Sequence, residues 1–598
     1  MAFSIAMPWN AGEERMHELM RVPENDNPTS TMLTPRATHL LQICPLLAVG
    51  TLDDQGRPWT TIWGGEPGFG TSLGSSMIGI RTLVDARYDP VVEALNSGKA
   101  DGKVVQEVGS GRMIGGLAID LDQRRRVKLY GRLAAGALDR SGDLEYHNIG
   151  QIQMVVRIEQ SIGNCPKYLN RKVIRPALSK PRLLSESPQL TEDALRLLER
   201  SDMLFITSAN KDLDMDTNHR GGPPGFVRVL YNGEDGAEIV YPEYSGNRLY
   251  QTLGNLQITP VAGLVFPDFV SGDVLYVTGK TEILIGKAAA DVLPRSNLAV
   301  KVKIIAARLV EQGLPFRGKP GEYSPYNPSV RLLAAEGTLA ANFGRPETRA
   351  TLVEKEKITP TITRYRFSTD KPINFSPGQW VALDFAPELD LGYSHMRDDD
   401  PSSLNDDFIR TFTVSSSPTL SGSNQAGTFE ITVRAVGRVT TFLSQKNPRA
   451  MLEVPIRGFG GELSIKDGSE GSDIPFIAGG VGITPLLGQL DSIDRSRLRL
   501  FWTLRAEDVG LAAALLRHYP DVQMSLYITG SRLNESAIKD SWELLQHGNG
   551  KIMTRRFEKA DFEGIDSSVW YLCTSVPLRA VLLEWLQGKN VVYEDFNF

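Results

Sequence analysis

Short apolar runs of strand length, separated by polar turns rich in glycine and proline, fill the first half of the chain. This pattern predicts β-strands. The runs at 362–369, 378–385, 408–417 and 428–436 continue it and predict a small antiparallel barrel. From Ile474 onward strand-like runs alternate with helical ones, which predicts a parallel sheet with crossover helices.

The first half also repeats itself. Residues 46–69 align without gaps on residues 203–226, and both segments end in Gly-Gly-x-Pro-Gly-Phe. Each copy is followed by a strand-like run that ends in glycine and a cation, at 127–132 and 274–280. The sequence therefore predicts two related β-rich units, and Thr191 is expected to begin a helix between them as its N-cap.

The segment "IAGGVGITPLLGQL" at 477–490 is the sharpest local motif. An apolar strand runs into glycines, and Thr484 is predicted to be the N-cap and Pro485 the first residue of a helix. The N–H groups and the dipole at such a helix start favour a pyrophosphate. The alternative interpretation is a tight strand–helix turn that needs glycine for steric reasons alone.

Composition excludes several classes of protein. The 598 residues are 41% hydrophobic and 23% charged, which suits a multidomain protein with packed cores. A net charge of −6 argues against a nucleic-acid partner, and no run of eighteen apolar residues predicts a membrane span. The three cysteines, Cys44, Cys165 and Cys573, are too few for a four-thiolate cluster, and no metal site is predicted. We expect a cytoplasmic protein whose redox chemistry, if any, uses an organic cofactor.

Residues 350–598 resemble the ferredoxin-NADP reductase superfamily, whose modules pass a hydride from a nicotinamide to FAD. "RTFT" at 410–413, "GRVTTFL" at 437–443 and "GGVGITP" at 479–485 match three of its motifs in the right order. The resemblance implies that Arg410 pairs with the FAD pyrophosphate, that Phe412 lies against the isoalloxazine and that Thr413 hydrogen-bonds the flavin near N5 and serves catalysis. The remaining implied cofactor contacts are Thr411, Gly437, Val439 and Thr440 for FAD, and Gly479, Gly480, Gly482, Thr484 and Pro485 for NADPH or NADH.

Three features at the end of the chain extend or depart from this resemblance. Cys573 stands where the family has Cys-Gly-Pro, but here the next residues are threonine and serine. The cysteine is therefore either a catalytic residue facing the nicotinamide or a buried thiol without a redox role. Glu594 and Phe596 match an acidic residue, expected to be catalytic, and an aromatic residue near the ends of some relatives. Phe596 or Phe598 would cover the flavin; the alternative is an ordinary packed terminal strand. Ser531 and Arg532 match residues that bind the 2'-phosphate of NADPH in some relatives; the alternative is a solvated loop.

Residues from about 35 to 335 resemble the pyridoxamine 5'-phosphate oxidase-like split-barrel group, whose members usually bind FMN. The segments behind this are 162–172, 218–229, 245–256 and 262–280. Their cations stand among glycines and strands and predict a phosphate cradle; the candidate residues are His219, Arg220, Arg228, Asn247, Arg248 and Lys280. Lys167 and Arg171 are expected to be solvated. His219 and Arg220 stand where the first copy has Ile62 and Trp63, which favours a ligand at the second copy. The resemblance also implies a homodimer.

The predicted fold is thus multidomain, α+β and α/β. It consists of a split-barrel region at 1–340 with units at about 35–175 and 190–335, an FAD-binding barrel at 350–470 and an NAD(P)-binding domain at 471–598. The leading hypothesis is an FAD-dependent NAD(P)H oxidoreductase that passes electrons to a second flavin or a small-molecule acceptor at the split barrel. The alternative is a reductase for a separate protein, with the split barrel as a non-catalytic binding or dimerisation module. The acidic stretch at 395–408 is expected to be a disordered, solvated insertion; the alternatives are a gate over the FAD or a contact with a cationic partner.

Overall fold

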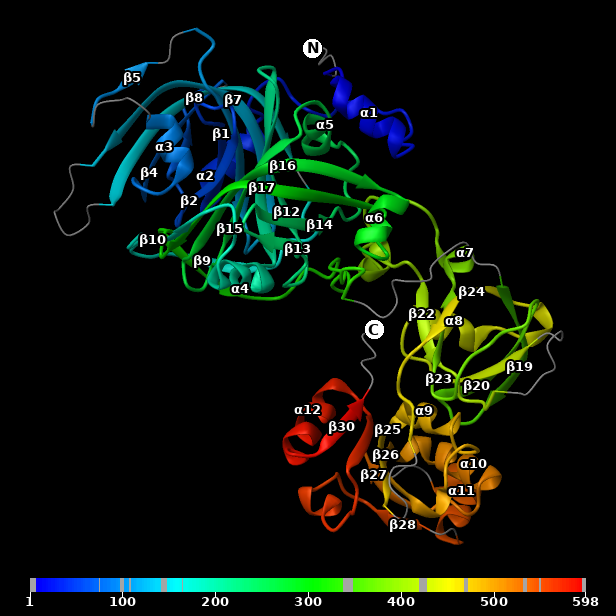
Figure 1. The fold of residues 1–598 in the computed structure, drawn as a ribbon. Helices are drawn as coiled ribbons and strands as arrows, with labels where there is room; N and C mark the ends of the chain where they lie inside the picture. Colours follow the sequence, from blue (N-terminus) through cyan, green and yellow to red (C-terminus); the bar gives the residue numbers. More distant parts are fainter. Residues whose placement is uncertain are drawn as a thin grey trace. The chain divides into compact units, whose positions relative to one another are not determined.

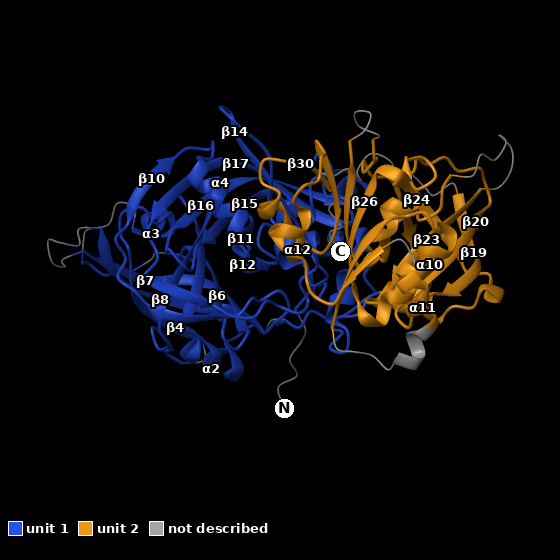
Figure 2. Ribbon diagram, turned by 90° about the horizontal axis from the view of Figure 1, so that it is seen from below, with its two compact units in different colours: residues 1–337, 393–406 blue, residues 338–392, 407–598 orange. Residues whose placement is uncertain are grey.

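The computed structural model divides the chain into two compact units (Figures 1 and 2). Unit 1 comprises Met1–Gly337 and Tyr393–Asp406, and unit 2 comprises Thr338–Gly392 and Asp407–Phe598. The structure describes residues 7–74, 76–96, 102–106, 109–140, 148–163, 165–336, 348–418, 427–466, 472–530, 535–547 and 550–593. Its sheets are mostly antiparallel, and one is parallel.

Unit 1 contains two eight-stranded sheets. The first, in the order β2-β1-β6-β7-β8-β4-β3 with β5 beside β7, is formed by β1 (Leu46–Leu52), β2 (Pro58–Gly64), β3 (Gly70–Ser72), β4 (Met77–Asp85), β5 (Val105–Gln106), β6 (Met113–Asp120), β7 (Arg125–Asp139) and β8 (Ile149–Gly163). The second, in the order β12-β11-β15-β16-β17-β14-β13 with β10 beside β17, is formed by β10 (Arg182–Glu186), β11 (Met203–Asn210), β12 (Asp214–Gly221), β13 (Arg228–Gly233), β14 (Gly236–Pro242), β15 (Val261–Pro267), β16 (Val274–Ile285) and β17 (Leu298–Glu311).

The two sheets have the same strand order and the same register. In the first hairpin Leu46 pairs with Gly64, and at the aligned positions of the second Met203 pairs with Gly221. We call β1–β8 the first repeat and β11–β17 the second repeat. The described residues of unit 1 also form a small two-stranded sheet and α-helices: β9 (Lys172–Pro176), β18 (Phe316–Pro320), α1 (Ala11–Leu19), α2 (Pro35–Ile43), α3 (Pro90–Asn96), α4 (Glu192–Arg200), α5 (Gln251–Ile258) and α6 (Lys287–Val292). As predicted, Thr191 caps α4.

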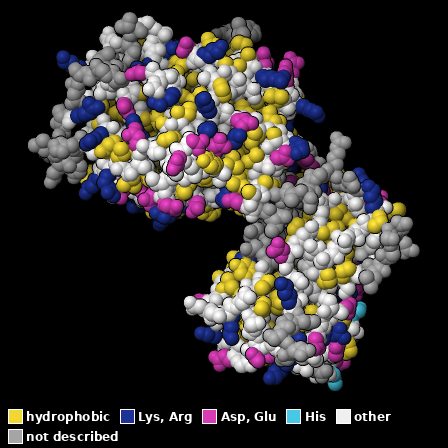
Figure 3. All heavy atoms as spheres, in the orientation of Figure 1, with side chains coloured by type: hydrophobic (Ala, Val, Ile, Leu, Met, Phe, Trp, Pro, Cys, Tyr) yellow, Lys and Arg dark blue, Asp and Glu magenta, His cyan; other side chains and the backbone are white. Residues whose placement is uncertain are grey.

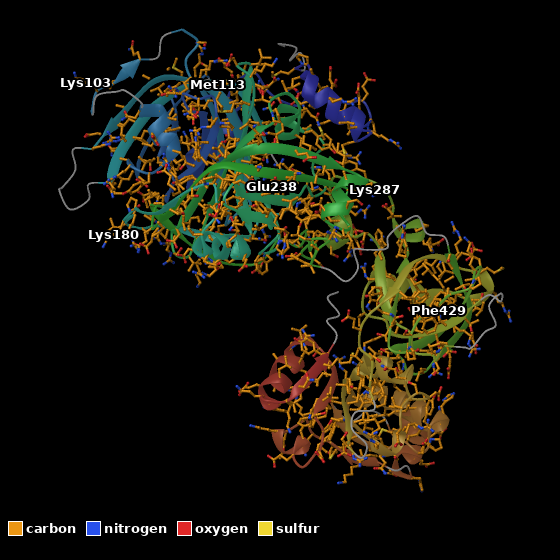
Figure 4. The ribbon with its side chains drawn as sticks, in the orientation of Figure 1. Lys103, Met113, Lys180, Glu238, Lys287 and Phe429 are labelled. Atoms are coloured by element: carbon orange, nitrogen blue, oxygen red, sulfur yellow. The ribbon has the colours of Figure 1, made fainter. Side chains whose placement is uncertain are left out.

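The repeats pack directly on each other through small residues. The hydroxyl of Thr60 in the first repeat donates to the carbonyl oxygen of Gly263 at 2.7 Å in the second, and its oxygen lies at hydrogen-bond distance, 2.8 Å, from Thr207 Oγ1. Gly50 aligns with Thr207, and a Cβ on Gly50 would lie 2.0 Å from the Thr207 hydroxyl. Glycine on one side therefore makes room for threonine on the other. Met113, labelled in Figure 4, joins Tyr130, Ala209 and Met215 in a small cluster at the same junction.

Alanine at Gly263 should destabilise unit 1. The added Cβ would lie 2.5 Å from the Pro58 carbonyl oxygen and 2.6 Å from the Trp59 Cα, and these are backbone atoms that a rotamer change cannot move. We expect Gly263→Ala to lower the thermal unfolding midpoint, at a free-energy cost of about 1–3 kcal/mol. Gly136→Ala is the control, because its Cβ would have its nearest neighbour at 3.7 Å. Equal midpoints for the two variants would contradict this packing.

The acidic stretch near residue 400 is ordered within unit 1, so the expectation of a disordered insertion is wrong. The Asn405 carbonyl oxygen accepts from Arg331 at 2.8 Å, and its side chain accepts from the Ser245 N–H at 3.0 Å and donates to the Tyr168 hydroxyl at 2.9 Å. Asp398 accepts from the Tyr326 hydroxyl at 2.6 Å. The segment contains a short 3₁₀ helix, η2 (Pro401–Asn405). Polar side chains from distant parts of the chain hold this segment in place. The local sequence pattern does not reveal these contacts, which is why the prediction failed.

The first sheet of unit 2 is the predicted small antiparallel one. Its order is β22-β21-β24-β19-β20-β23, and a bridge between Val414 and Ile431 brings its two edge strands together. Its elements are β19 (Thr348–Lys357), β20 (Ile362–Thr369), β21 (Trp380–Asp384), α7 (Ala386–Leu389), β22 (Ile409–Thr413), β23 (Thr428–Arg434), α8 (Arg438–Gln445) and β24 (Glu453–Gly460). Phe429, labelled in Figure 4, stacks on Phe367 with ring centroids 5.4 Å apart in its core.

The second sheet of unit 2 confirms the predicted parallel arrangement. Its order is β28-β27-β26-β25-β29-β30, so the chain moves outward from β25 in one direction and then returns to β29 on the other side. The elements are β25 (Ile474–Gly479), α9 (Thr484–Leu487), β26 (Leu498–Arg505), α10 (Val509–His518), β27 (Met524–Thr529), α11 (Glu535–His547), β28 (Gly550–Met553), β29 (Val569–Cys573), α12 (Val576–Trp585) and β30 (Asn590–Tyr593). None of the helices in the described ranges is both long and apolar enough to cross a membrane.

Candidate functional site

The edge strand β22 carries the residues predicted to hold FAD. Arg410 lies 3.9 Å from Asp407, and its Nη1 donates to the Ile409 carbonyl oxygen at 3.0 Å. Phe412 is 8% exposed and packs edge-on against Phe385, so most of its ring lies in the barrel core. Thr411 and Thr413 alternate with them along the strand, and Thr413 is 6% exposed. The structure thus places Arg410 and Phe412 on one side of β22 and the two threonines on the other.

Helix α8 begins at the second predicted motif. Gly437 is its N-cap, and the Thr440 hydroxyl accepts from the N–H groups of Val436 at 3.0 Å and Gly437 at 2.9 Å. Val439 is 1% exposed and belongs to the barrel core. The Thr440 side chain therefore caps its own helix, which leaves the following N–H groups as the helix donors for an anion.

The glycine loop after β25 starts its helical turn earlier than predicted. Gly480–Ile483 form a 3₁₀ helix, η4, which runs directly into α9. Thr484 has helical backbone angles (φ −57°, ψ −37°) and the N-cap of α9 is Ile483, so the assignment of Thr484 as N-cap is wrong. The early start is possible because Gly480 takes a φ of +58°, which turns the chain before the threonine is reached.

Gly482 brings the loop against the end of β29. A Cβ on Gly482 would lie 2.0 Å from the Cys573 carbonyl oxygen and 3.3 Å from its Sγ. A Cβ on Gly479 would lie 3.3 Å from the Thr574 Cβ. The structure therefore brings the predicted nucleotide loop and Cys573 together at the carboxyl ends of β25 and β29. Cys573 itself is 4% exposed within the domain core.

A buried charge pair, which no sequence motif indicated, lies beside this loop at the end of β23. Asp508 is fully buried; it accepts from Arg434 Nη2 at 2.6 Å and from the hydroxyls of Thr359 at 3.1 Å and Thr361 at 2.9 Å. A Cβ on Gly480 would lie 3.5 Å from Arg434 Nη2, and the Gly480 carbonyl oxygen accepts from Trp502 Nε1 at 2.9 Å. Arg434, which pairs with Asp508, thus lies against the loop at the end of β23, three residues before Gly437, where the predicted FAD motif begins.

Four of the predicted site residues lie outside the described residues: Ser531, Arg532, Glu594 and Phe596. The roles that the resemblance assigns to them, including the preference for NADPH, stay predictions.

Three of the cations predicted to form the phosphate cradle of the second repeat, Arg220, Arg228 and Arg248, already have partners. Arg220 pairs with Glu243 at 2.5 Å, and Arg228 pairs with Glu336 at 2.5 Å. The Arg248 guanidinium lies 3.3 Å from the Tyr393 ring centroid, and Lys280 is exposed. The Asn247 side chain accepts from the Leu249 N–H at 3.2 Å. His219 lies against another cation. The ligand roles of all six residues stay predictions, as does the homodimer.

The cation against His219 is Arg126, a residue that the motifs did not indicate. Arg126 on β7 is 7% exposed, its Nη1 contacts both nitrogens of the His219 ring, and its Nε is buried without a hydrogen-bond partner in the described structure. Burial lowers the pKa of Arg126 well below its ordinary value. Lys167 is also close: it is 1% exposed, which makes the prediction of a solvated side chain wrong, and burial lowers its pKa to about 8.

Comparison with known proteins finds similarity in solved structures only. No family model and no curated protein matches the chain. The flavohaem-like FAD/NAD-binding domain of nitric oxide dioxygenase from Vibrio cholerae O1 biovar El Tor is similar at 14% identity and a TM-score of 0.31, over 42% of this chain and 99% of that one. The CS-b5R domains of human Ncb5or are similar at 12% identity and a TM-score of 0.31, over 62% of this chain and 99% of that one. A ferredoxin NADP+ reductase from Neisseria gonorrhoeae is similar at 14% identity and a TM-score of 0.27, over 41% of this chain and 97% of that one.

Proposed function

We propose that the chain is a flavin-dependent NAD(P)H oxidoreductase. Unit 2 binds FAD along β22 and α8 and takes NAD(P)H at the carboxyl ends of β25 and β29; the electrons then pass to an acceptor held by the N-terminal repeats. The observation that carries the proposal is the position of the glycine loop. In open parallel sheets, ligands bind where the strand order reverses, and that point here lies between β25 and β29.

The residues of β22 and α8 fit FAD. The Thr413 hydroxyl is largely shielded from solvent, yet it has no hydrogen-bond partner among the described residues, so it is available to a flavin ring. Arg410 lies at the same edge strand, and a guanidinium suits a pyrophosphate because it donates in a planar fork. FAD would supply the hydride-accepting chemistry, and the protein would supply orientation and charge.

The switch-point loop fits a dinucleotide. Gly480 and Gly482 leave no side chain between the backbone and the sheet edge, which permits the close approach that a pyrophosphate needs. The Arg434–Asp508 pair holds this loop in one position relative to β23. Such fixed positioning matters because hydride transfer requires the two reacting rings to be held in contact and away from water.

The acceptor is proposed at the N-terminal repeats. The observation that supports this is the buried group of cations around Arg126, which a soluble β-sheet module does not need for stability. The acceptor is either a second flavin, FMN, or a small molecule. If the purified chain held FAD alone and its N-terminal repeats bound neither FMN nor a small-molecule acceptor, that result would favour a reductase for a separate protein partner instead.

Arg410→Gln tests the FAD part of the proposal. Loss of one charge-assisted contact to a pyrophosphate should weaken FAD binding by ~10- to 100-fold, so the purified variant should contain less FAD and oxidise NADPH more slowly with an artificial acceptor. The control is Arg366→Gln on β20, whose guanidinium pairs with Glu354 and Glu430 on the surface of the same barrel. Full FAD content in Arg410→Gln would overturn the assignment.

A further inference from the structure

The glycine loop is bonded to a tryptophan on the neighbouring strand. Strand β26 runs beside β25 in parallel, and Trp502 lies opposite Ala478, just before the loop (Figure 1). The Trp502 side chain is fully buried in the core of this domain, and its Nε1–H donates to the Gly480 carbonyl oxygen at 2.9 Å. A core side chain therefore holds the backbone at the first residue of η4.

This hydrogen bond determines which way the Gly480 peptide group faces. In a planar trans peptide, the carbonyl of one residue and the N–H of the next point in opposite directions, so the Val481 N–H is turned away from the indole. Gly480 has a φ of +58°, and glycine adopts positive and negative φ about equally well. The residue itself therefore does not select this conformation, and a contact such as the Trp502 bond has to do so.

Another buried tryptophan of the same sheet shows that packing alone does not require such a bond. Trp570 on β29 is 1% exposed, and its Nε1 is buried without a hydrogen-bond partner in the described structure. It belongs to a separate apolar cluster with Phe501 and Phe562. Buried indoles usually find a partner for their N–H. Trp570 thus serves packing, whereas Trp502 serves packing and also bonds the glycine loop.

We propose that Trp502 is a positioning residue for the nicotinamide coenzyme. Its indole N–H holds the Gly480 peptide, and with it the loop that runs to Thr484, in the conformation that binds NAD(P)H. This inference rests on the proposed function, because it takes the loop as the coenzyme site. Trp502 is fully buried, so it acts through Gly480 and does not touch the coenzyme itself.

A positioning role predicts which constant changes when the bond is lost. A site that is only partly in its competent conformation binds with an affinity reduced by that fraction. Trp502→Phe keeps an aromatic ring in the core and removes the N–H, so the dissociation constant of the coenzyme should rise by about 10-fold, a usual effect of one hydrogen bond. The loop of the bound complex is the same, so the limiting rate of flavin reduction should not change.

The first experiment needs no coenzyme. Amide hydrogen exchange of the FAD-loaded full chain is followed by mass spectrometry for peptides that cover residues 477–490. The loop amides of Trp502→Phe should exchange about 10-fold faster than those of the wild type, because the bond no longer opposes opening of the loop. Trp570→Phe is the matched control, since it removes a buried indole N–H that has no partner in the described structure, and its loop should exchange at the wild-type rate. Equal exchange in the wild type and Trp502→Phe would overturn the proposal.

The second experiment measures coenzyme binding. The same proteins are mixed anaerobically with increasing NADPH and, separately, NADH, and the rate of flavin reduction gives a dissociation constant and a limiting rate. Trp502→Phe should change the dissociation constant alone, and Trp570→Phe should change neither constant. Both tryptophans are buried, so the substitutions leave the surface unaltered, where Figure 3 shows lysine and arginine side chains beside aspartate and glutamate. Long-range attraction of the anionic coenzyme is therefore the same in all three proteins.

Gly480→Ala perturbs the same loop without a change in the core. Its Cβ would meet Arg434 Nη2 at 3.5 Å, an ordinary contact, but the positive φ is strained for any residue that carries a Cβ. The dissociation constant should therefore rise by about 10-fold here too, at an unchanged limiting rate. This variant tests the loop even where Trp502→Phe fails to fold.

Two results of the binding experiment would contradict the assignment. A dissociation constant that rises as much in Trp570→Phe as in Trp502→Phe would trace the effect to a looser core. A lower limiting rate at an unchanged dissociation constant would place the effect of the indole after binding. If neither coenzyme reduces the flavin of the wild type, the proposed function fails, and the exchange experiment still decides whether Trp502 holds the loop.

Discussion

Asp508→Ala should lower the free energy of unfolding of unit 2 by about 3–5 kcal/mol, the usual effect of leaving one member of a buried ion pair without its partner. Asp508 is fully buried and accepts hydrogen bonds from Arg434, Thr359 and Thr361. Its removal leaves the Arg434 guanidinium without its carboxylate and takes the acceptor away from the Thr359 and Thr361 hydroxyls. Differential scanning calorimetry of the full chain should show the effect on the transition that belongs to unit 2.

The matched control is Asp521→Ala. Asp521 also accepts from an arginine, Arg495, at 2.8 Å, but Asp521 is exposed and Arg495 is only half-buried, so solvent replaces the lost contact. The loss in free energy of unfolding for Asp508→Asn should lie between the losses for these two variants, because the asparagine amide oxygen still accepts from the threonine hydroxyls. If Asp508→Ala unfolded at the same temperature as Asp521→Ala, Asp508 would not hold the glycine loop to the barrel.

Gly482→Ala should reduce kcat/KM for NADPH or NADH by about 100-fold without loss of FAD. Its Cβ would lie 2.0 Å from the Cys573 carbonyl oxygen, so the loop has to move away from β29. A displacement of about 1 Å is enough for such a loss, because the reacting rings must be aligned. Steady-state kinetics and the flavin content of the same preparation give the two readouts.

Gly479→Ala provides the graded comparison for this loop. Its Cβ would approach the Thr574 side chain at 3.3 Å, a contact that a small shift relieves. We expect a milder loss of kcat/KM. Equal activity of wild type and Gly482→Ala would show that nicotinamide does not bind at the β25–β29 edge.

The structural features that the sequence predicted correctly depend on residues that are close together along the chain. Strand patterns located β22 and the parallel sheet, and Thr191 was recognised as a cap because capping involves residues three positions apart. The gapless repeat indicated two related units, and their shared register is visible in the pairs Leu46–Gly64 and Met203–Gly221. The error at Thr484 arose because a Ser/Thr-Pro helix start is a local rule, and a 3₁₀ turn preceded it here.

The contacts that the sequence did not predict are made by residues that are far apart along the chain. Arg126 and His219 meet only because the repeats pack together, and Lys167 is buried through a segment more than two hundred residues away. The cations chosen for a phosphate cradle, such as Arg220, looked available because Glu243 is not adjacent in sequence. Charge pairing across strands has no local pattern, so burial and ion pairs had to come from the structure.

The central claim is that unit 2 accepts a hydride from NAD(P)H onto bound FAD. The most direct test is anaerobic rapid mixing of the FAD-loaded full chain with NADPH and, separately, with NADH, while the absorption of oxidised flavin is followed. The account predicts that at least one coenzyme bleaches the flavin in a single turnover, more slowly in Gly482→Ala. A fully loaded chain whose flavin stays oxidised with both coenzymes would contradict it.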